Sequence, residues 1–259
     1  MFASKSQYGM LSTMYVDSGI TQLLTMVTNS YNGSVLRATL RELRNAAYRH
    51  KYLVAANYVS VEGLVNDGCN REAIIPLSQW SYGNAPLCDV QAIALLVKRQ
   101  QPLNLFEFGT FTGQTSLVLM LNASTQSTLW TLDLPQVSRE SVAGLHWERN
   151  IEELAVGSSF RNHECSSRIV QLLEDSMTFD VAPYTNTMDL VYVDACHDYN
   201  HVKSDTEKAV HMCKNGGVVV WHDVNTGCPD VMRLVGEVSK AVKVYVVSNT
   251  NVAYMTVNK

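Results

Sequence analysis

The sequence has 259 residues, of which 46% are hydrophobic and 17% are charged, and its formal net charge is −4. These values are typical of a single globular α/β domain with some additional helix. The negative net charge argues against a surface that follows the phosphates of DNA or RNA, and against an anionic membrane as a partner.

The cysteines and the apolar runs indicate the cellular compartment. The six cysteines are scattered and none forms a C-x-x-C pair, which is typical of reduced thiols in a cytosolic protein. The N-terminal residues show no basic segment leading into an apolar one, so we expect no signal peptide. No apolar run approaches the ~20 residues that span a bilayer. We therefore predict a cytoplasmic protein.

The N-terminal third of the sequence is predicted to be helical. Residues 17–32 and 34–58 have the pattern of helices, and 34–58 places apolar residues at helical spacing. A third helix is expected over 89–100, with Asp89 as its N-cap. Because these helices have no strand partners, we expect residues 1–73 to form a helical lid or oligomerisation segment. Residues 74–259 would then form the main domain.

Strand-like and helix-like stretches alternate in the rest of the sequence. The strand-like runs are 103–108, 128–132, 168–173, 189–193, 217–221, 241–247 and 252–257, and the clearest helix-like stretches between them are 114–122, 138–155 and 199–213. This alternation predicts an α/β fold with a mostly parallel sheet and helices on both faces. The last two runs are separated only by a short turn, which favours an antiparallel hairpin at the edge of the sheet.

A glycine-containing turn, GTFTG, directly follows the first of these strands. The dinucleotide pattern G-x-G-x-x-G would need glycines in place of Phe111 and Gln114, and no lysine follows Gly113 to complete a phosphate-binding loop. The turn therefore lacks a signature for holding a diphosphate. Gly109 and Gly113 permit a tight turn and close approach of the backbone. Glu107, just before the turn, could attract a cationic group that carries an amine.

Acidic and hydroxyl residues follow the next two strands. Asp133 stands at the end of one strand, where a carboxylate suits the hydroxyls of a ribose. Asp175 and Ser176 follow the other strand and could meet the edge of an adenine. A nucleoside with a positively charged tail and no phosphate fits all three positions, and S-adenosylmethionine has this composition.

Histidine and aspartate residues follow the fourth and fifth strands. Asp194 and His197 follow the fourth strand, and His222 and Asp223 follow the fifth. The ends of neighbouring parallel strands meet at one edge of a sheet, so we expect these residues to converge on one pocket. Histidine is a suitable general base at neutral pH, and a divalent cation could lower the pKa of an acceptor hydroxyl. Carboxylates favour magnesium or manganese, whereas imidazoles favour zinc, iron or nickel.

The sequence resembles the class I methyltransferases that use S-adenosylmethionine. Glu107, Gly109 and Gly113 match their glycine-rich motif, and Asp133 matches the acidic residue after the second strand. The stretches DLVYVDACHDYNHVKSD and KNGGVVVWHDV are similar to the branch that includes macrolide-sugar, cephamycin and catechol O-methyltransferases. The resemblance covers about residues 74–257. It implies a Rossmann-like seven-stranded sheet of order 3-2-1-4-5-7-6 with the last strand antiparallel.

The donor site and the catalytic site are predicted on this basis. The predicted donor-binding residues are Glu107, Gly109, Thr110, Phe111, Gly113, Thr115, Asp133, Asp175, Ser176 and Asp194. We predict that His197 is the general base, and that Asp194 and Asp223 bind a divalent cation such as Mg²⁺. His222 would be a third ligand or a second base. By the resemblance, matching positions in metal-dependent sugar methyltransferases play these roles.

The sequence departs from the family pattern at two of these positions and leaves alternatives open. Ala195 stands where relatives usually have glycine, and His222 stands where metal-dependent relatives often have a carboxylate. His222 could instead only form hydrogen bonds within its loop, Asp194 could contact the amino group of the donor, and His197 could be structural. The choice between oxygen and nitrogen as the methylated atom also stays open.

The predicted function is O-methylation of a small natural-product-like molecule by a homo-oligomeric enzyme. A nucleic-acid methyltransferase is disfavoured, because the charge is negative and the Asn/Asp-Pro-Pro-aromatic motif of amino-methylating enzymes is missing after the fourth strand. A non-haem metal oxygenase could use His197, His222 and one aspartate. A protein that binds the donor without catalysis is the remaining alternative.

Overall fold

The computed structural model describes residues 34–64, 72–76, 85–135 and 155–259. The chain divides into two compact units, Met1–Lys51 and Tyr52–Lys259. The described residues of the first unit lie in helix α2 (Ser34–Tyr52), which falls within the helix expected over 34–58. The helix expected over 17–32 and nearly all of the one expected over 138–155 lie outside the described residues.

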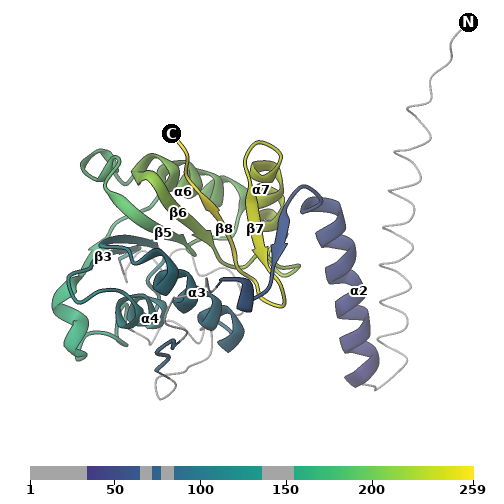
Figure 1. The fold of residues 1–259 in the computed structure, drawn as a ribbon, viewed down its shortest axis with the longest axis horizontal. Helices are drawn as coiled ribbons and strands as arrows, with labels where there is room; N and C mark the ends of the chain where they lie inside the picture. The colour runs from purple at the N-terminus through teal and green to yellow at the C-terminus, as the bar shows by residue number, and fades with distance from the viewer. Residues whose placement is uncertain (1–33, 65–71, 77–84, 136–154) are drawn as a thin grey trace, which may run out of the picture. The chain divides into compact units, whose positions relative to one another are not determined.

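The second unit contains one eight-stranded sheet among its described residues (Figure 1). The order across the sheet is β1-β7-β8-β6-β5-β2-β3-β4, and β8 runs antiparallel to both of its neighbours while the other pairs are parallel. The strands are β1 (Asn57–Val59), β2 (Asn104–Phe108), β3 (Thr128–Asp133), β4 (Ile169–Leu173), β5 (Met188–Val193), β6 (Cys213–Trp221), β7 (Val244–Val247) and β8 (Ala253–Thr256). Counted from β2, the seven later strands give the order 3-2-1-4-5-7-6, so the predicted fold is confirmed.

Two elements differ from the expectation. β1 lies within the segment 1–73 that was expected to be helical, and it pairs in parallel with β7. The β7–β8 hairpin is therefore not at the edge of the sheet, because β1 occupies that edge. A three-residue strand is too short to give a periodic pattern. Helix α7 (Pro229–Ser239) was also not predicted, although Pro229 stands at its first turn, where proline favours helix initiation.

Helices pack on both faces of the sheet, which is why its central strands are almost entirely apolar. On one face, Leu105 of β2 joins the core formed with α3 (Leu87–Gln100) and α4 (Gln114–Asn122). On the other face, the ring of Phe106 packs against those of Phe179 and Tyr184, with centroid separations of 5.8 and 5.4 Å. Helix α6 (Tyr199–Met212) connects β5 to β6. Three short 3-10 helices complete the described elements: η1 (Glu62–Leu64), η4 (Glu164–Arg168) and η5 (Ala182–Tyr184).

The start of α3 corrects one prediction. The helix begins at Leu87 after Pro86, so Asp89 lies inside its first turn and is not the N-cap. The Asp89 side chain is completely buried. Its partners lie far away in the sequence and belong to the site described below.

Among the residues that the structure describes, no helix combines the length and the hydrophobicity needed to cross a bilayer.

Candidate active site

The strand register brings the predicted residues to one edge of the sheet. Phe108 of β2 is paired with Leu132 of β3 and with Val193 of β5, and Val193 is paired with Trp221 of β6. The residues that follow these four positions therefore lie side by side at the carboxyl ends of the strands. This is where open α/β sheets bind their ligands.

The glycine turn is packed against the protein itself. Gly109 has φ of +93°, and a β-carbon there would lie 2.1 Å from the carbonyl oxygen of Asp194. Gly113 has φ of +81°, and a β-carbon there would lie 2.4 Å from the ring of Phe160. Both glycines are thus required by the close approach of neighbouring protein segments. No ligand needs to be invoked to explain why side chains are missing at these two positions.

Asp133 fixes the conformation of the turn. Its Oδ2 accepts hydrogen bonds from the backbone N–H groups of Thr110 at 2.9 Å and Phe111 at 2.7 Å. Its Oδ1 accepts one from the N–H of Leu134 at 2.7 Å. Phe111 has φ of +49°, a conformation that is uncommon for a residue other than glycine. The carboxylate therefore holds the turn to the end of β3, and its binding to a ribose stays a prediction.

Glu107 supports the turn from beneath. It is fully buried, and its Oε2 accepts hydrogen bonds from the hydroxyls of Ser116 and, at 2.6 Å, Thr131. Its Oε1 has no hydrogen-bond partner among the described residues. Burial raises the pKa of Glu107 from 4.5 to about 8, against the two hydroxyls that lower it. The carboxyl is therefore largely uncharged at neutral pH, and a direct contact with a cationic donor stays a prediction.

The other predicted donor residues lie on nearby segments. Thr110 is buried and its hydroxyl is 2.7 Å from that of Thr131, while Thr115 is half-buried in the first turn of α4. Asp175 and Ser176 follow β4, and Asp175 Oδ1 accepts a hydrogen bond from the N–H of Met177 at 2.9 Å. The Lys208 ammonium on α6 donates to the Ser176 carbonyl. These contacts place the loop against α6, and its role toward an adenine stays a prediction.

The structure brings the four histidine and aspartate residues together. His197 Nε2 lies 3.0 Å from Asp223 Oδ2 and 3.9 Å from Asp194 Oδ1. His222 Nδ1 lies 3.2 Å from Asp194 Oδ1 and 3.5 Å from Asp223 Oδ1. Asp223 has φ of +55°, a backbone conformation that aspartate tolerates better than most residues. We call these four residues the His/Asp cluster.

A further carboxylate in contact with this cluster, that of Asp89, was missed by the sequence reasoning. His222 Nε2 lies 3.0 Å from Asp89 Oδ2, so His222 is held between two carboxylates. Asn251 holds Asp89 in turn, through its backbone N–H at 2.9 Å and its side-chain amide at 2.8 Å. Asp89 and His222 are 133 positions apart in the sequence. The only local signal was a carboxylate at a helix start, which usually indicates a cap.

The contacts within the cluster keep both histidines protonated. Burial alone would lower the pKa of His197, but the hydrogen bonds with Asp194 and Asp223 raise it to about 12. Asp194, Asp223 and Asp89 likewise hold the pKa of His222 well above 6.5 against the effect of burial. Burial would raise the pKa of Asp194 and of Asp223, yet both lie below 3.8 because the histidines stabilise the carboxylates.

The donor atoms of the cluster also suit a divalent cation. One ligand atom each from Asp194, His222 and Asp223 lie within 4.8 Å of one another, and so do those of His197, Asp223 and Cys228. The two carboxylates, from Asp194 and Asp223, are oxygen ligands of the kind that bind divalent ions. The residues present therefore fit such an ion. To bind, the ion has to replace the protonated histidines as the partners of the two carboxylates.

The segment that carries most of these residues matches a known family. Residues 106–224 match the family model described as a methyltransferase domain. Residues 106–224 therefore resemble a methyltransferase domain. The predicted resemblance to methyltransferases is thereby confirmed. The matched segment includes the glycine turn, Asp133 and the His/Asp cluster, whereas Asp89 and Asn251 lie outside it.

The chain is also similar to solved structures. Three of them are O-methyltransferases or methyltransferases: TomG from Streptomyces achromogenes, which is involved in tomaymycin synthesis and was solved with SAM; an enzyme from Bacillus cereus solved with SAH; and PaMTH1 from Podospora anserina, also bound to SAH. The identities are 20%, 18% and 12%, and the TM-scores are 0.47, 0.48 and 0.47. The matches cover 68%, 70% and 68% of this chain and 82%, 86% and 80% of the respective neighbours. Similarities this distant assign neither an activity nor a substrate. No curated protein matches the sequence.

Proposed function

We propose that the protein transfers a methyl group from S-adenosylmethionine to a hydroxyl group of a small acceptor. The observation that carries this proposal is the contact between the two halves of the site. The glycine turn packs directly on the end of β5, with no room for a β-carbon between Gly109 and the Asp194 carbonyl. A donor bound along the turn would therefore reach the His/Asp cluster, where an acceptor hydroxyl can be deprotonated.

The donor class follows from what the turn can and cannot hold. The turn has neither the third glycine of a dinucleotide fingerprint nor the lysine of a phosphate-binding loop. The carboxylate of Asp133 stands half-buried at the end of β3 instead. These features favour a nucleoside with a cationic tail over a nucleotide.

The reaction is a displacement at the methyl carbon. The acceptor oxygen forms a bond to this carbon, the carbon–sulfur bond breaks, and its electron pair neutralises the sulfonium. The hydroxyl proton passes to His197. One ring nitrogen of His197 is bonded to Asp223, and the side chain of His197 is partly exposed to solvent. The acceptor oxygen has to be held about 3–3.5 Å from the methyl group and in line with the breaking bond.

The high pKa of His197 sets a condition on this role. With a pKa of about 12, the ring is protonated in the ligand-free protein and cannot accept a proton. A second positive charge near Asp194 and Asp223 would compete for these carboxylates and lower the pKa of the imidazolium. The donor is itself a cation. We therefore infer that His197 becomes a base only when the site is loaded.

A divalent cation would add to the same effect. Asp194 and Asp223 would hold it, and when bound it would supply charge that stabilises the alkoxide form of the acceptor. His222 is not among the ligands we propose, because its Nε2 is bonded to Asp89 and its Nδ1 faces Asp194. This arrangement also weakens the oxygenase alternative, which needs two histidines with a free nitrogen.

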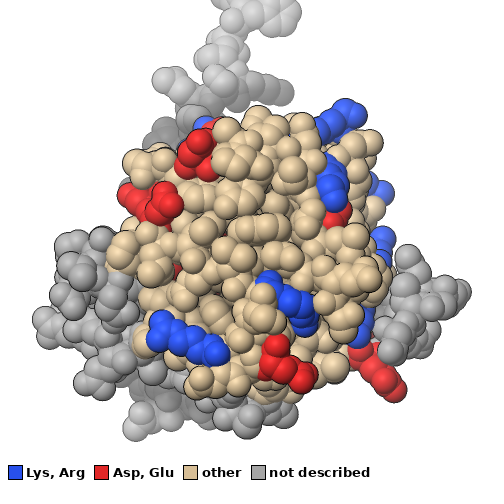
Figure 2. All heavy atoms as spheres, turned by 90° about the vertical axis from the view of Figure 1, so that its left-hand side faces the viewer, with Lys and Arg blue, Asp and Glu red and all other residues tan. Residues whose placement is uncertain are grey.

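Charge supports a small acceptor over a nucleic acid. The net charge is −4, which is unfavourable for contacts with phosphates. On the face shown in Figure 2, the basic and acidic side chains of the described residues are scattered among uncharged ones. A groove that tracks a nucleic-acid backbone would instead concentrate lysine and arginine.

Homo-oligomerisation and the lid role of residues 1–73 also stay proposals.

The test is methyl transfer to a panel of phenols, catechols and hydroxylated glycosides, with matching amines included for comparison. We expect a methyl ether from at least one class when the protein is supplied with isotopically labelled S-adenosylmethionine. The His197→Ala variant should then lose about 10²- to 10⁴-fold in turnover with little change in donor affinity. His211→Ala, on the exposed last turn of α6, is the matched control and should keep full activity.

Two results would contradict the proposal. Transfer to a nitrogen-containing acceptor only would replace O-methylation by N-methylation. Turnover by His197→Ala that equals that of His211→Ala would remove His197 as the base while leaving the donor assignment intact.

A further inference from the structure

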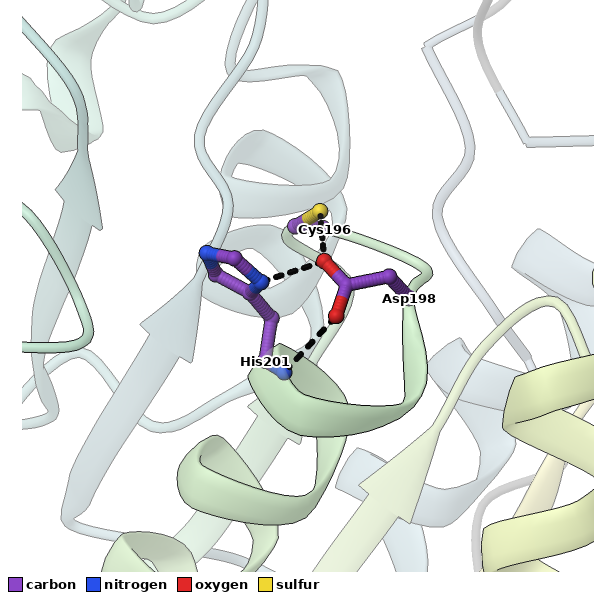
Figure 3. A group of neighbouring side chains, drawn as sticks. All are labelled: Cys196, Asp198 and His201. Carbon is purple, nitrogen blue, oxygen red and sulfur yellow. Dashed lines mark hydrogen bonds and ion pairs between the residues drawn. The ribbon is translucent and has the colours of Figure 1, made fainter.

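A second cluster of ligand-type side chains lies on the loop after β5 and the first turn of α6. It consists of Cys196, Asp198 and His201, whose sulfur, carboxylate oxygen and ring nitrogen lie within 4.8 Å of one another. Figure 3 shows the three side chains turned toward a common point at the start of α6. The cluster shares no residue with the His/Asp cluster, and it is half-buried to exposed, so an ion can reach it from solvent.

Two potential donors compete for one oxygen in this cluster. The Cys196 thiol donates to Asp198 Oδ2 at 3.0 Å, and His201 Nδ1 contacts the same oxygen. The other oxygen, Oδ1, caps α6 by accepting from the N–H groups of Asn200 at 3.0 Å and His201 at 3.3 Å. The cap fixes the carboxylate, so Oδ2 stays directed at the sulfur and the imidazole. A cation bound by all three atoms would replace this competition by three bonds.

A buried carboxylate behind the cluster provides an independent observation. Asp205 lies one turn further along α6 than His201 and is completely buried. Neither of its oxygens makes a hydrogen bond of normal geometry with the described residues. His201 and Asp205 are four positions apart on α6, so they lie on the same face of the helix. Metal-bound histidines commonly have a second carboxylate behind them that orients the ring.

We propose that Cys196, Asp198 and His201 form a site for a divalent transition metal, with zinc the best match. One thiolate, one imidazole and one carboxylate are the ligand types that zinc prefers, and water would complete a tetrahedron. Sulfur and nitrogen ligands select against magnesium and calcium, which bind oxygen. Binding releases the thiol proton, because the thiolate is the ligand.

The position of the site suggests a structural role. The bound ion would connect the loop after β5 to the first turn of α6. His197 lies on this loop between Cys196 and Asp198, with its ring directed instead at Asp223. The ion would thus hold the backbone on both sides of His197. The proposed ion site does not depend on the identity of the methyl donor or of the acceptor.

Cobalt substitution tests the site directly, because a cysteine-bound Co²⁺ gives a sulfur-to-metal charge-transfer band. We expect the full-length metal-free protein to bind one equivalent of Co²⁺ with this band, and Zn²⁺ to displace it. Cys196→Ser should abolish the band. Cys228→Ser is the matched control, since Cys228 belongs to the alternative group with His197 and Asp223, and it should keep the band.

The variants also separate this proposal from binding elsewhere. A band that survives in Cys196→Ser but is lost in Cys228→Ser would place the ion in the His/Asp cluster and overturn the proposal. A band that survives in both variants, or no band in the wild-type protein, would overturn it as well. His201→Asn checks the imidazole independently of any cysteine, and it should weaken Zn²⁺ binding at least about 10-fold. Unchanged affinity in that variant would contradict the ligand set.

Discussion

The glycine turn and the His/Asp cluster touch each other but are held by different forces. The turn is fixed by close backbone approach and by hydrogen bonds to Asp133, a residue only 23 positions from Thr110. The cluster is held by charges that come from three separate segments: the residues after β5, the residues after β6, and Asp89 on α3. We therefore expect added atoms to destabilise the turn, whereas the removal of a charge should destabilise the cluster.

The largest effect is expected from adding one methyl group to the turn. In Gly109→Ala the new β-carbon would meet the Asp194 carbonyl at 2.1 Å in a backbone with φ of +93°. Because the obstacle is backbone, we expect a loss of roughly 4 kcal/mol or more in the free energy of unfolding. Chemical denaturation of the purified variants measures it.

Gly216→Ala isolates the contribution of the backbone conformation. Gly216 has φ of +82°, but no atom lies within 4 Å of a β-carbon built there. This variant should lose only about 1–2 kcal/mol. Equal losses in the two variants would show that the packing of Gly109 on β5 does not matter, and the contact between the two halves of the site would lose its support.

The next effect is expected from neutralising Asp89. Asp89→Asn leaves the protonated His222 with one carboxylate fewer in a buried position, so we expect a loss of about 3 kcal/mol in the free energy of unfolding. Asp230→Asn is the control, because Asp230 is also an acidic residue in the first turn of a helix. A similar small loss in both variants would mean that Asp89 acts only on the helix dipole.

An effect that depends on pH, instead of a fixed loss of stability, is expected at Glu107. Its pKa is raised from 4.5 to about 8, so the folded protein holds a proton that the unfolded chain releases. The stabilisation is complete below pH 4.5 and is lost as the pH rises toward 8, by at most about 1.4 kcal/mol per pH unit. Glu107→Gln cannot titrate, so its stability should exceed that of the wild type increasingly over this interval.

Denaturation curves at pH 5, 6, 7 and 8 measure this difference. A difference between Glu107→Gln and the wild type that stays constant with pH would contradict the buried, protonated carboxyl. It would favour instead a charged Glu107 that is available to a cationic donor.

The sequence could predict the fold because its signals are local. Each buried strand from β2 onward forms an apolar run, and α4 occupies the predicted residues 114–122. The residues after each strand could be assigned to one edge of the sheet, because parallel strands bring their carboxyl ends together. Asp194, His197, His222 and Asp223 are near one another for this reason.

The remaining features depend on contacts between distant segments. Asp89 looks like a helix cap in the sequence, and only the folded chain shows that its carboxylate reaches His222 and Asn251. The reason for Gly113 also lies elsewhere, in the ring of Phe160. The pKa of His197 follows from the simultaneous presence of two carboxylates, which spacing in the sequence cannot fix.

Calorimetric titration of the full-length protein with S-adenosylmethionine tests the central claim most directly. The titration should be made after chelation of divalent metals and repeated with NAD⁺, whose diphosphate the turn has no signature for holding. The account predicts saturable binding of S-adenosylmethionine at one site per chain and no binding of NAD⁺. The absence of binding by S-adenosylmethionine, with or without added magnesium, would contradict the account.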